Sequence, residues 1–231
     1  GPSTGWNSSV GRLPVRAALD DASPMPQQRR IVVGVTGAGG TRLAGVLLNK
    51  LVDDERVGHV DVMVSANGRK LVAFEHGADE TADAVALLLG RQSDEVWREK
   101  VTVYDPETDQ AGPPSSGSYR FTDMIILPCA LGAAARIAHG TANTLLERGA
   151  DVCLKERRRL VLCIRETPLN LIHLRNLVQL TEAGAVVYPM IPTYYNVPQN
   201  LKQMDEEFVL RLLGFIGLDQ TDYYEWKDSS G

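Results

Sequence analysis

An arginine and a glutamate directly follow a strand-like run of apolar residues. Residues 160–164 are continuously apolar, and Arg165 and Glu166 come next, ahead of a Thr-Pro pair that is typical of a helix start. The carboxyl end of a parallel strand beside a helix N-terminus is where α/β sheets bind phosphates. A buried guanidinium without a partner is costly, so we expect Arg165 to meet an anion. The sequence therefore predicts a phosphate-bearing ligand at this point.

Three further residues that could contact a phosphate occur near the ends of predicted elements, together with a tyrosine. Arg148 and Lys155 are seven residues apart, so they lie on one helix face two turns apart. Arg211 lies in the last predicted helix, and Tyr195 lies in the Pro-rich segment 190–203. A phenol in such a segment can donate a hydrogen bond or a proton to a phosphate, although packing between subunits explains Tyr195 equally well. For the three arginines after Lys155, stabilisation of a helix C-terminus is the better explanation.

A glycine-rich turn follows the first predicted strand. Residues 31–36 are apolar, and Gly37, Gly39 and Gly40 separate them from a run with helical spacing, 41–51. The N–H groups of such a turn can contact a phosphate or a flavin, although the same residues can also form only a tight turn. The pattern lacks the third glycine of the dinucleotide fingerprint, and no acidic residue ends the second predicted strand. These features disfavour NAD and leave a mononucleotide.

The remaining polar residues point to no metal site. Cys129, Cys153 and Cys163 each lie in an apolar run without a fourth zinc ligand at suitable spacing, and no Asp-rich magnesium motif is present. We interpret the cysteines as buried thiols in a reducing compartment, with a catalytic thiol at Cys129 as the alternative. Glu75 follows an apolar helix face, so by itself it is a carboxylate at a helix end.

The composition is typical of one globular domain. The chain has 231 residues, of which 44% are hydrophobic and 23% charged, and a formal net charge of −5. This charge argues against nucleic acid as a main partner. No apolar stretch approaches the ~20 residues that span a bilayer, so we expect a cytoplasmic protein that does not bind membranes.

Predicted strands and helices alternate along the chain. The strands are 31–36, 60–65, 100–104, 122–128, 159–164 and 185–188, and the helices are 41–51, 67–74, 81–89, 131–139, 142–155, 170–183 and 205–217. Continuous apolar strands indicate a parallel sheet that is buried on both faces by helices. We predict one α/β domain over 30–218. It is preceded by a disordered or tag-derived extension, 1–29, and followed by a tail, 219–231. The long loop 105–118 is predicted to be functional or mobile.

In this order, these features resemble the UbiX-type flavin prenyltransferases over residues 30 to about 218. The most specific motifs are Pro-Cys at 128–129, Ile-Ala-His-Gly at 137–140, and the stretches 148–158, 165–169, 182–186 and 192–199. The resemblance implies a flavodoxin-like Rossmann fold and a trimer-based assembly, typically a dodecamer, with active sites between subunits. It also implies transfer of a dimethylallyl group from its monophosphate to N5 and C6 of reduced FMN, without a metal. The prenylated FMN then serves a UbiD-type decarboxylase.

The resemblance also assigns roles to individual residues. Glu75, Lys155 and Tyr195 match catalytic groups, and Arg148, Lys155, Tyr195 and Arg211 match groups around the prenyl phosphate. The residues that match FMN contacts are Gly37, Ala38, Gly39, Ser65, Ala130, Leu131, Gly132, Ala133 and Arg165.

Three hydroxyl groups of the family pattern are missing on the flavin side. Gly39 replaces a serine, and Ala130 and Ala133 stand where serine and threonine are usual. Two alternatives to a prenyltransferase therefore stay open. One is a relative of the flavin-dependent cysteine decarboxylases, and the other is an FMN-binding homologue without catalysis.

Overall fold

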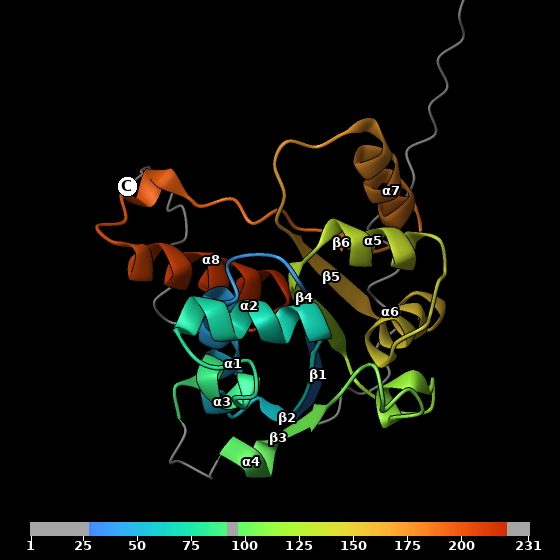
Figure 1. The fold of residues 1–231 in the computed structure, drawn as a ribbon, viewed down its shortest axis with the longest axis horizontal. Coiled ribbons are helices and arrows are strands. Elements are labelled where there is room, and N and C mark those ends of the chain that lie inside the picture. The colour runs from blue at the N-terminus through green and yellow to red at the C-terminus, as the bar shows by residue number, and fades with distance from the viewer. Residues whose placement is uncertain (1–27, 92–96, 221–231) are drawn as a thin grey trace, which may run out of the picture.

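The continuous apolar runs form the strands of one parallel sheet, as the sequence predicts. The computed structural model describes residues 28–91 and 97–220. In it, six strands lie in the order β3-β2-β1-β4-β5-β6, and every neighbouring pair is parallel (Figure 1). Their bounds are β1 Arg29–Val35, β2 Val57–Val64, β3 Val101–Tyr104, β4 Asp123–Cys129, β5 Arg159–Ile164 and β6 Val186–Val187.

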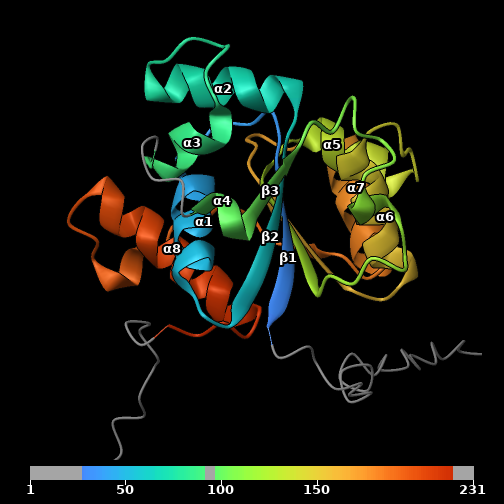
Figure 2. The same ribbon diagram turned by 90° about the horizontal axis from the view of Figure 1, so that it is seen from below.

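Helices cover both faces of the sheet and bury it (Figure 2). One side carries α1 Arg42–Asp53, α2 Ala66–His76, α3 Ala84–Leu89 and α8 Leu201–Phe215, and the other carries α5 Leu131–Ala138, α6 Leu145–Lys155 and α7 Leu171–Glu182. A short helix, α4 Trp97–Lys100, precedes β3. Successive strand residues point to opposite faces. Ile31 and Val33 accordingly join the core under α1 and α8, whereas Val32 joins the core under α5 and α6.

Helix capping explains where the observed boundaries differ from the predicted ones. Helix α6 begins at Leu145 rather than at residue 142, because Thr144 and Glu147 form a reciprocal capping box. Helix α8 begins at Leu201, four residues before the predicted start, because the Asn200 side chain accepts a hydrogen bond from the Gln203 N–H. Helix α4 was not predicted, since four residues give too short a periodic pattern.

The loop 105–118, which the sequence predicts to be functional or mobile, contacts the domain at its buried Pro114 and at its end. It contains a short turn, η1 Pro113–Ser115, and Pro114 is buried. Arg158, which follows α6, donates hydrogen bonds to the carbonyl oxygens of Gly117 and Tyr119, at 2.5 and 2.7 Å. The guanidinium therefore holds the end of this loop against α6.

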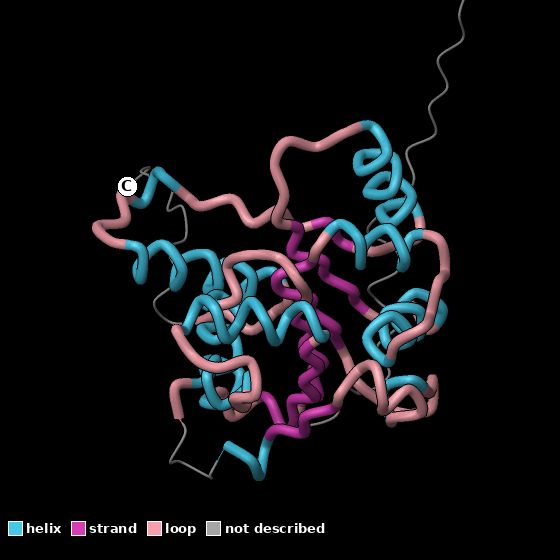
Figure 3. The backbone as a smooth tube through the Cα atoms, in the orientation of Figure 1, coloured by secondary structure: helices cyan, strands magenta, loops and turns pink. Residues whose placement is uncertain are grey.

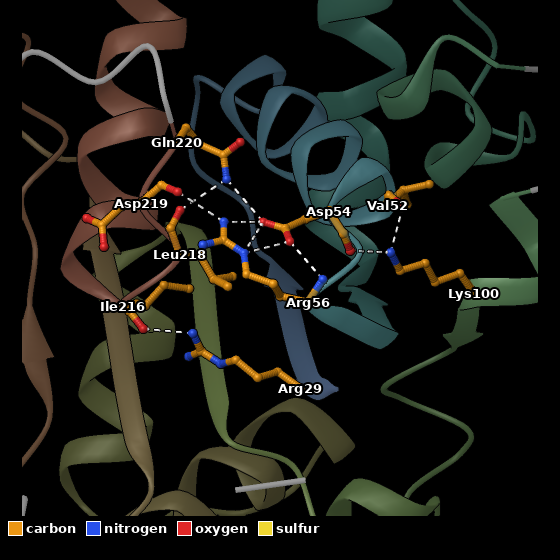
Figure 4. Close-up of polar contacts among 9 residues, drawn as sticks. All are labelled: Arg29, Val52, Asp54, Arg56, Lys100, Ile216, Leu218, Asp219 and Gln220. Carbon is orange, nitrogen blue, oxygen red and sulfur yellow. Dashed lines mark hydrogen bonds and ion pairs between the residues drawn. The ribbon is translucent and has the colours of Figure 1, made fainter. Parts of the chain in front are cut away.

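Polar contacts fasten the segment after α8 to the amino-terminal edge of the sheet (Figure 4). Arg56 donates to both carboxylate oxygens of Asp54, with the shortest contact at 2.6 Å, and Gln220 donates to Asp54 Oδ2 at 3.1 Å. Arg29 donates to the Ile216 carbonyl oxygen at 2.9 Å. These contacts join the end of α8 to β1 and to the turn between α1 and β2.

The predicted extension 1–29 and tail 219–231 lie almost entirely outside the described residues, so those domain boundaries stay predictions. Within the described ranges, no helix is long and apolar enough to cross a membrane.

A fully buried carboxylate lies between the sheet and the residues that follow the long loop. Asp61 in β2 has no exposed surface, and the Tyr119 hydroxyl donates to its two oxygens at 3.1 and 3.0 Å. Arg30, His59 and Tyr104 also face this carboxylate. Burial raises the pKa of Asp61, and this effect outweighs the hydrogen bond from Tyr119 and the charges of His59 and Arg30.

We expect Asp61→Asn to gain stability relative to the wild type as the pH rises. Because the folded-state pKa of Asp61 is raised, its stabilising contribution is present at low pH and is lost as the pH rises through that pKa. The amide is neutral at every pH, so the variant does not show this loss. Urea unfolding of both proteins between about pH 4 and 7 measures the difference. An advantage of the variant that is constant across this range would contradict the assignment.

Candidate functional site

A reversal in strand order places a pocket where the sequence predicts a ligand. From β1 the chain continues to β2 on one side, whereas β4 pairs with β1 on its other side. Open α/β sheets bind ligands outside the carboxyl ends of the strands at such a switch point. The pocket there has a volume of about 400 Å³, which suits a small molecule. It is lined by Gly37, Ala38, Gly39, Leu71, Phe74, Glu75, Ala130, Arg165 and Glu166.

Helix α2 carries Glu75 to the rim of this pocket because its first turn lies very close to β1. A Cβ atom on Gly68 would lie 2.6 Å from the Val35 carbonyl oxygen, so only glycine permits this approach. Ser65 caps the helix, and its hydroxyl oxygen accepts a hydrogen bond from the Gly68 N–H at 3.1 Å. The hydroxyl that the resemblance assigns to FMN therefore also has a local role at the start of α2.

The Glu75 carboxylate lies across the N-terminus of α1. Its Oε1 atom accepts a hydrogen bond from the Gly40 N–H at 2.7 Å. Its Oε2 atom accepts from the N–H and from the hydroxyl of Thr41, at 2.8 and 2.6 Å. A negative charge at a helix N-terminus is stabilised by the helix dipole and by the unpaired N–H groups. Glu75 thus caps α1 from a neighbouring helix while it lines the pocket.

Gly39 leaves a gap between Glu75 and Arg165. An ideal Cβ atom on Gly39 would lie 3.5 Å from Glu75 Oε1 and 3.7 Å from Arg165 Cζ, which are ordinary van der Waals contacts. The Gly39 backbone also lies outside the left-handed region, unlike that of Gly40, whose φ is +90°. A serine would therefore fit at residue 39, and its hydroxyl would stand between the carboxylate and the guanidinium.

Helix α5 begins at the pocket with free N–H groups. At the neighbouring helix starts, side-chain oxygens accept the hydrogen bonds of such N–H groups. The acceptors are Glu75 at α1, Glu107 at α2 and Asn170 at α7. No side chain caps α5, and within the described residues the N–H groups of 131–133 have no hydrogen-bond partner. Such a start is a site for an anion, because the N–H groups and the dipole both favour negative charge.

Arg165 is exposed at the pocket rim, so the expectation of a buried guanidinium is wrong for the single chain. Strand β5 ends at Ile164, and the next residue already lies beyond the cover of the helices. Among the described residues, the Arg165 side chain has neither a hydrogen bond nor an ion pair. It is therefore available to a ligand.

The single chain does not bring Arg148 and Lys155 to this pocket. Lys155 ends α6 just before β5 begins, whereas Arg165 follows the other end of β5. A strand of this length separates the two by about 20 Å. Lys155 Nζ pairs with Glu156 at 2.5 Å, and Arg148 has no side-chain partner in the part of the chain that the structure describes.

Arg211 and Tyr195 belong to a second region, between β6 and α8. Arg211 lines a pocket of about 500 Å³ together with Tyr194, Thr193 and Phe208. Tyr195 lies in a short turn, η2 Tyr194–Asn196. Figure 3 shows the chain between β6 and α8 as a long loop that is interrupted by this short helical turn. The predicted phosphate groups therefore occupy separate regions of one subunit.

Sequence reasoning missed some pocket residues and misplaced others. Glu166 was noted only as the neighbour of Arg165, although it lines the pocket. The helix face before Glu75 was interpreted as apolar, which suggests burial, yet Phe74 on it is 80% exposed. The contact of Thr41 with Glu75 left no signal in the sequence, because the two residues lie on different helices.

The cysteines are buried free thiols, as predicted. Burial raises the pKa of the Cys129 thiol to about 12, which leaves almost no thiolate near neutral pH. This argues against the alternative of a catalytic thiol at Cys129.

Comparison with known proteins identifies the family. The family model described as Flavoprotein matches residues 20–206. The chain is 35% identical to the flavin prenyltransferase UbiX of Chlamydia pneumoniae over 202 residues, which cover 87% of this chain and 98% of that protein. It is 36% identical to the UbiX enzyme of Archaeoglobus fulgidus over 198 residues, with coverage of 85% and 99%.

Solved structures give the same result. AnUbiX (PadA1), crystallised with FMN and dimethylallyl pyrophosphate, has a TM-score of 0.74 and 36% identity, covering 87% of this chain and 98% of that chain. A dodecameric FMN-dependent UbiX-like decarboxylase from Escherichia coli O157:H7 has a TM-score of 0.74 and 34% identity, covering 86% and 99%. The chain belongs to the Flavoprotein family, and within it to the UbiX-type flavin prenyltransferases.

The residues around the pocket fit a phosphate-bearing flavin. The free N–H groups at the start of α5 and the unpaired Arg165 guanidinium can bind a phosphate. Leu71 and Phe74 supply apolar surface that an isoalloxazine ring could contact. The three missing hydroxyls do not remove these donors, because the donors are backbone N–H groups and a guanidinium.

We expect two substitutions of Ala130 to separate helix capping from phosphate binding. Both Ala130→Ser and Ala130→Asp supply an N-cap to α5, which stabilises the ligand-free protein by roughly 0.5–2 kcal/mol. Only the aspartate places a negative charge where a phosphate would bind. Ala130→Asp should therefore weaken FMN binding while Ala130→Ser retains it, as measured by fluorescence titration and thermal unfolding. Equal FMN affinities for both variants would place the phosphate elsewhere.

Proposed function

We propose that this protein is a flavin prenyltransferase that joins a dimethylallyl group from dimethylallyl monophosphate to N5 and C6 of reduced FMN. The product is prenylated FMN. The observation that carries the proposal is the pocket at the switch point. There, a glutamate held by a helix N-terminus lies beside an unpaired arginine and an uncapped helix. The similarity to UbiX enzymes over nearly their whole length supports the same reaction.

FMN and the residues around it would have different roles in the reaction. Reduced FMN supplies the nucleophilic atoms N5 and C6. Arg165 and the N–H groups of 131–133 would hold the flavin phosphate. Glu75 Oε1, which lies near Gly39, is the atom placed to accept and return a proton at the flavin.

A neighbouring subunit would complete the prenyl phosphate site. Three cations are exposed on the single chain and do not line the pocket that contains Arg165: Arg148, Lys155 and Arg211. Lys155 pairs only with its neighbour Glu156 among the described residues. We infer that Tyr195 and the cations meet across subunit contacts. There they would stabilise the phosphate that leaves with the electron pair of its bond to the dimethylallyl carbon.

Exposed apolar residues support such an assembly. Helix α7 exposes Leu171, Ile172 and Val178, and the segment after β6 exposes Ile191 and Val197. Patches of this kind mark interaction sites. We infer a trimer-based homo-oligomer, and the dodecameric structure of the Escherichia coli relative supports the larger form.

The proposal extends to the surroundings of the enzyme. We infer that a UbiD-type decarboxylase receives the prenylated FMN, as the family implies. The three free buried thiols support a reducing compartment, and we place the protein in the cytoplasm.

The reaction is tested directly by anaerobic incubation with reduced FMN and dimethylallyl monophosphate, followed by mass spectrometry of the flavin. A parallel incubation with dimethylallyl pyrophosphate, the ligand crystallised with AnUbiX, identifies the donor. A flavin of increased mass is the expected result. FMN that binds but keeps its original mass would favour an FMN-binding homologue without catalysis. The three missing hydroxyls are the observation that supports this alternative. Structures of the FMN-dependent cysteine decarboxylases TvaF and SpaF, at 14% and 20% identity, show similarity of fold alone.

We expect Lys155→Ala and Arg211→Ala to weaken binding of the prenyl donor far more than binding of FMN. Each change removes a charge-assisted contact worth roughly 1.5–3 kcal/mol. Titration of each ligand into the oligomeric protein measures the two affinities. Lys202→Ala is the matched control on α8, because Lys202 is exposed and pairs only with Glu206. Equal losses for both ligands would mean that Lys155 and Arg211 are structural.

We expect Glu75→Gln to abolish formation of prenylated FMN while FMN still binds. The amide keeps the shape and one acceptor oxygen for the cap of α1, but it cannot transfer a proton at neutral pH. Flavin mass spectrometry and FMN titration report the two effects separately. A variant as active as the wild type would show that Glu75 only caps the helix.

A further inference from the structure

A buried threonine supplies the only side-chain hydrogen bond that Glu75 receives within the described residues. The Thr41 side chain belongs to a residue with no exposed surface, and its hydroxyl donates to Glu75 Oε2 at 2.6 Å. The other two hydrogen bonds to this carboxylate come from the backbone N–H groups of Gly40 and Thr41.

The direction of this hydrogen bond is unusual for the residue's position. Thr41 is the N-cap of α1, where a threonine oxygen normally accepts a hydrogen bond from the helix. The Thr41 side chain makes no such capping bond. Its hydroxyl donates instead to a carboxylate 34 residues away in sequence, on α2. The hydroxyl is thus a third donor to the Glu75 carboxylate, in addition to the two N–H groups through which Glu75 caps α1.

The hydroxyl restricts how the carboxylate can rotate. Two donors converge on Oε2, whereas Oε1 has one donor and lies near Gly39 and Arg165. Gly39 offers no side chain that could hold the carboxylate from the pocket side. The Thr41 hydroxyl therefore adds the one side-chain contact, among the described residues, that holds Oε2 against α1 and keeps Oε1 directed toward the pocket.

We propose that Thr41 is a positioning residue that orients Glu75 for proton transfer at the flavin. This inference rests on the proposed function, since it assumes that Glu75 handles the proton. Thr41 itself is not among the residues that line the pocket. It fixes the carboxylate with Oε2 against α1 and Oε1 toward the pocket, and a hydroxyl at residue 39 could share this task because a serine fits there.

The test compares Thr41→Val, which removes the hydroxyl at nearly constant shape, with Thr41→Ser, which retains it. We expect Thr41→Val to lower kcat for prenylated-FMN formation by roughly 10- to 100-fold, a part of the full effect of a general acid–base group. The KM for the prenyl donor and the Kd for FMN should change little. Thr41→Ser should keep most of the activity, and Gly39→Ser added to Thr41→Val should restore part of it.

Amide hydrogen exchange gives a readout that needs no reaction. The N–H groups of residues 40 and 41 donate to Glu75, so a carboxylate released by Thr41→Val should leave them less protected, whereas Thr41→Ser should leave them protected. Segments far from the pocket, such as β5, should exchange equally in all variants.

The outcomes are distinguishable. If the wild type forms no prenylated FMN, the proposed function fails, and the exchange data alone decide whether Thr41 holds Glu75. Unchanged protection and unchanged kcat in Thr41→Val would overturn the inference. Equal losses in Thr41→Val and Thr41→Ser, or a KM that rises in step with a general loss of stability, would also overturn it and assign Thr41 to packing.

Discussion

Every helix that starts at the carboxyl edge of the sheet must find acceptors for its first N–H groups, and this requirement organises the whole site. Helix α1 obtains them from Glu75, α2 from Ser65 and Glu107, and α7 from Asn170. Each of these side chains is thereby fixed at a helix start, and Glu75 also lines the pocket. Helix α5 obtains none from the described residues, so it leaves its N–H groups to a ligand. We therefore expect an anion to bind at the uncapped start of α5 rather than at the helices that the protein caps.

A second constraint is the separation of the two ends of β5. Arg165 stands after the strand and Lys155 stands before it, so a rigid strand keeps these two cations apart. One subunit thus has the pocket beside Arg165 and, elsewhere on its surface, the side chains of Arg148, Lys155 and Arg211. Association through the exposed residues of α7 and of the segment after β6 would bring these parts together. The active site is then a property of the assembly rather than of the chain.

The sequence predicts the layered fold well because continuous apolar strands and amphipathic helices are local patterns. It also locates the turn at Gly37–Gly39 and the strand end at Arg165, since both follow directly on apolar runs. It fails where the outcome depends on contacts across the fold. The exposure of Arg165 follows from the helices that stop short of it, and the attachment of the end of the loop 105–118 follows from Arg158. The hydrogen bond from Thr41 to Glu75 requires α1 and α2 to be in place first, and Gly68 permits the close approach of α2 to β1.

The double role of Glu75 has a consequence for the history of this fold. A carboxylate that caps α1 is retained by selection for a stable protein, even in a lineage in which the chemistry has been lost. A glutamate at this position in a related sequence is thus evidence that α1 is capped, and it is weaker evidence that the protein is an enzyme. The Thr41 hydroxyl makes no capping bond to α1, so we expect selection for stability to constrain it less than Glu75. Gain or loss of catalysis among such proteins should therefore be traced at residues 39 and 41 rather than at Glu75.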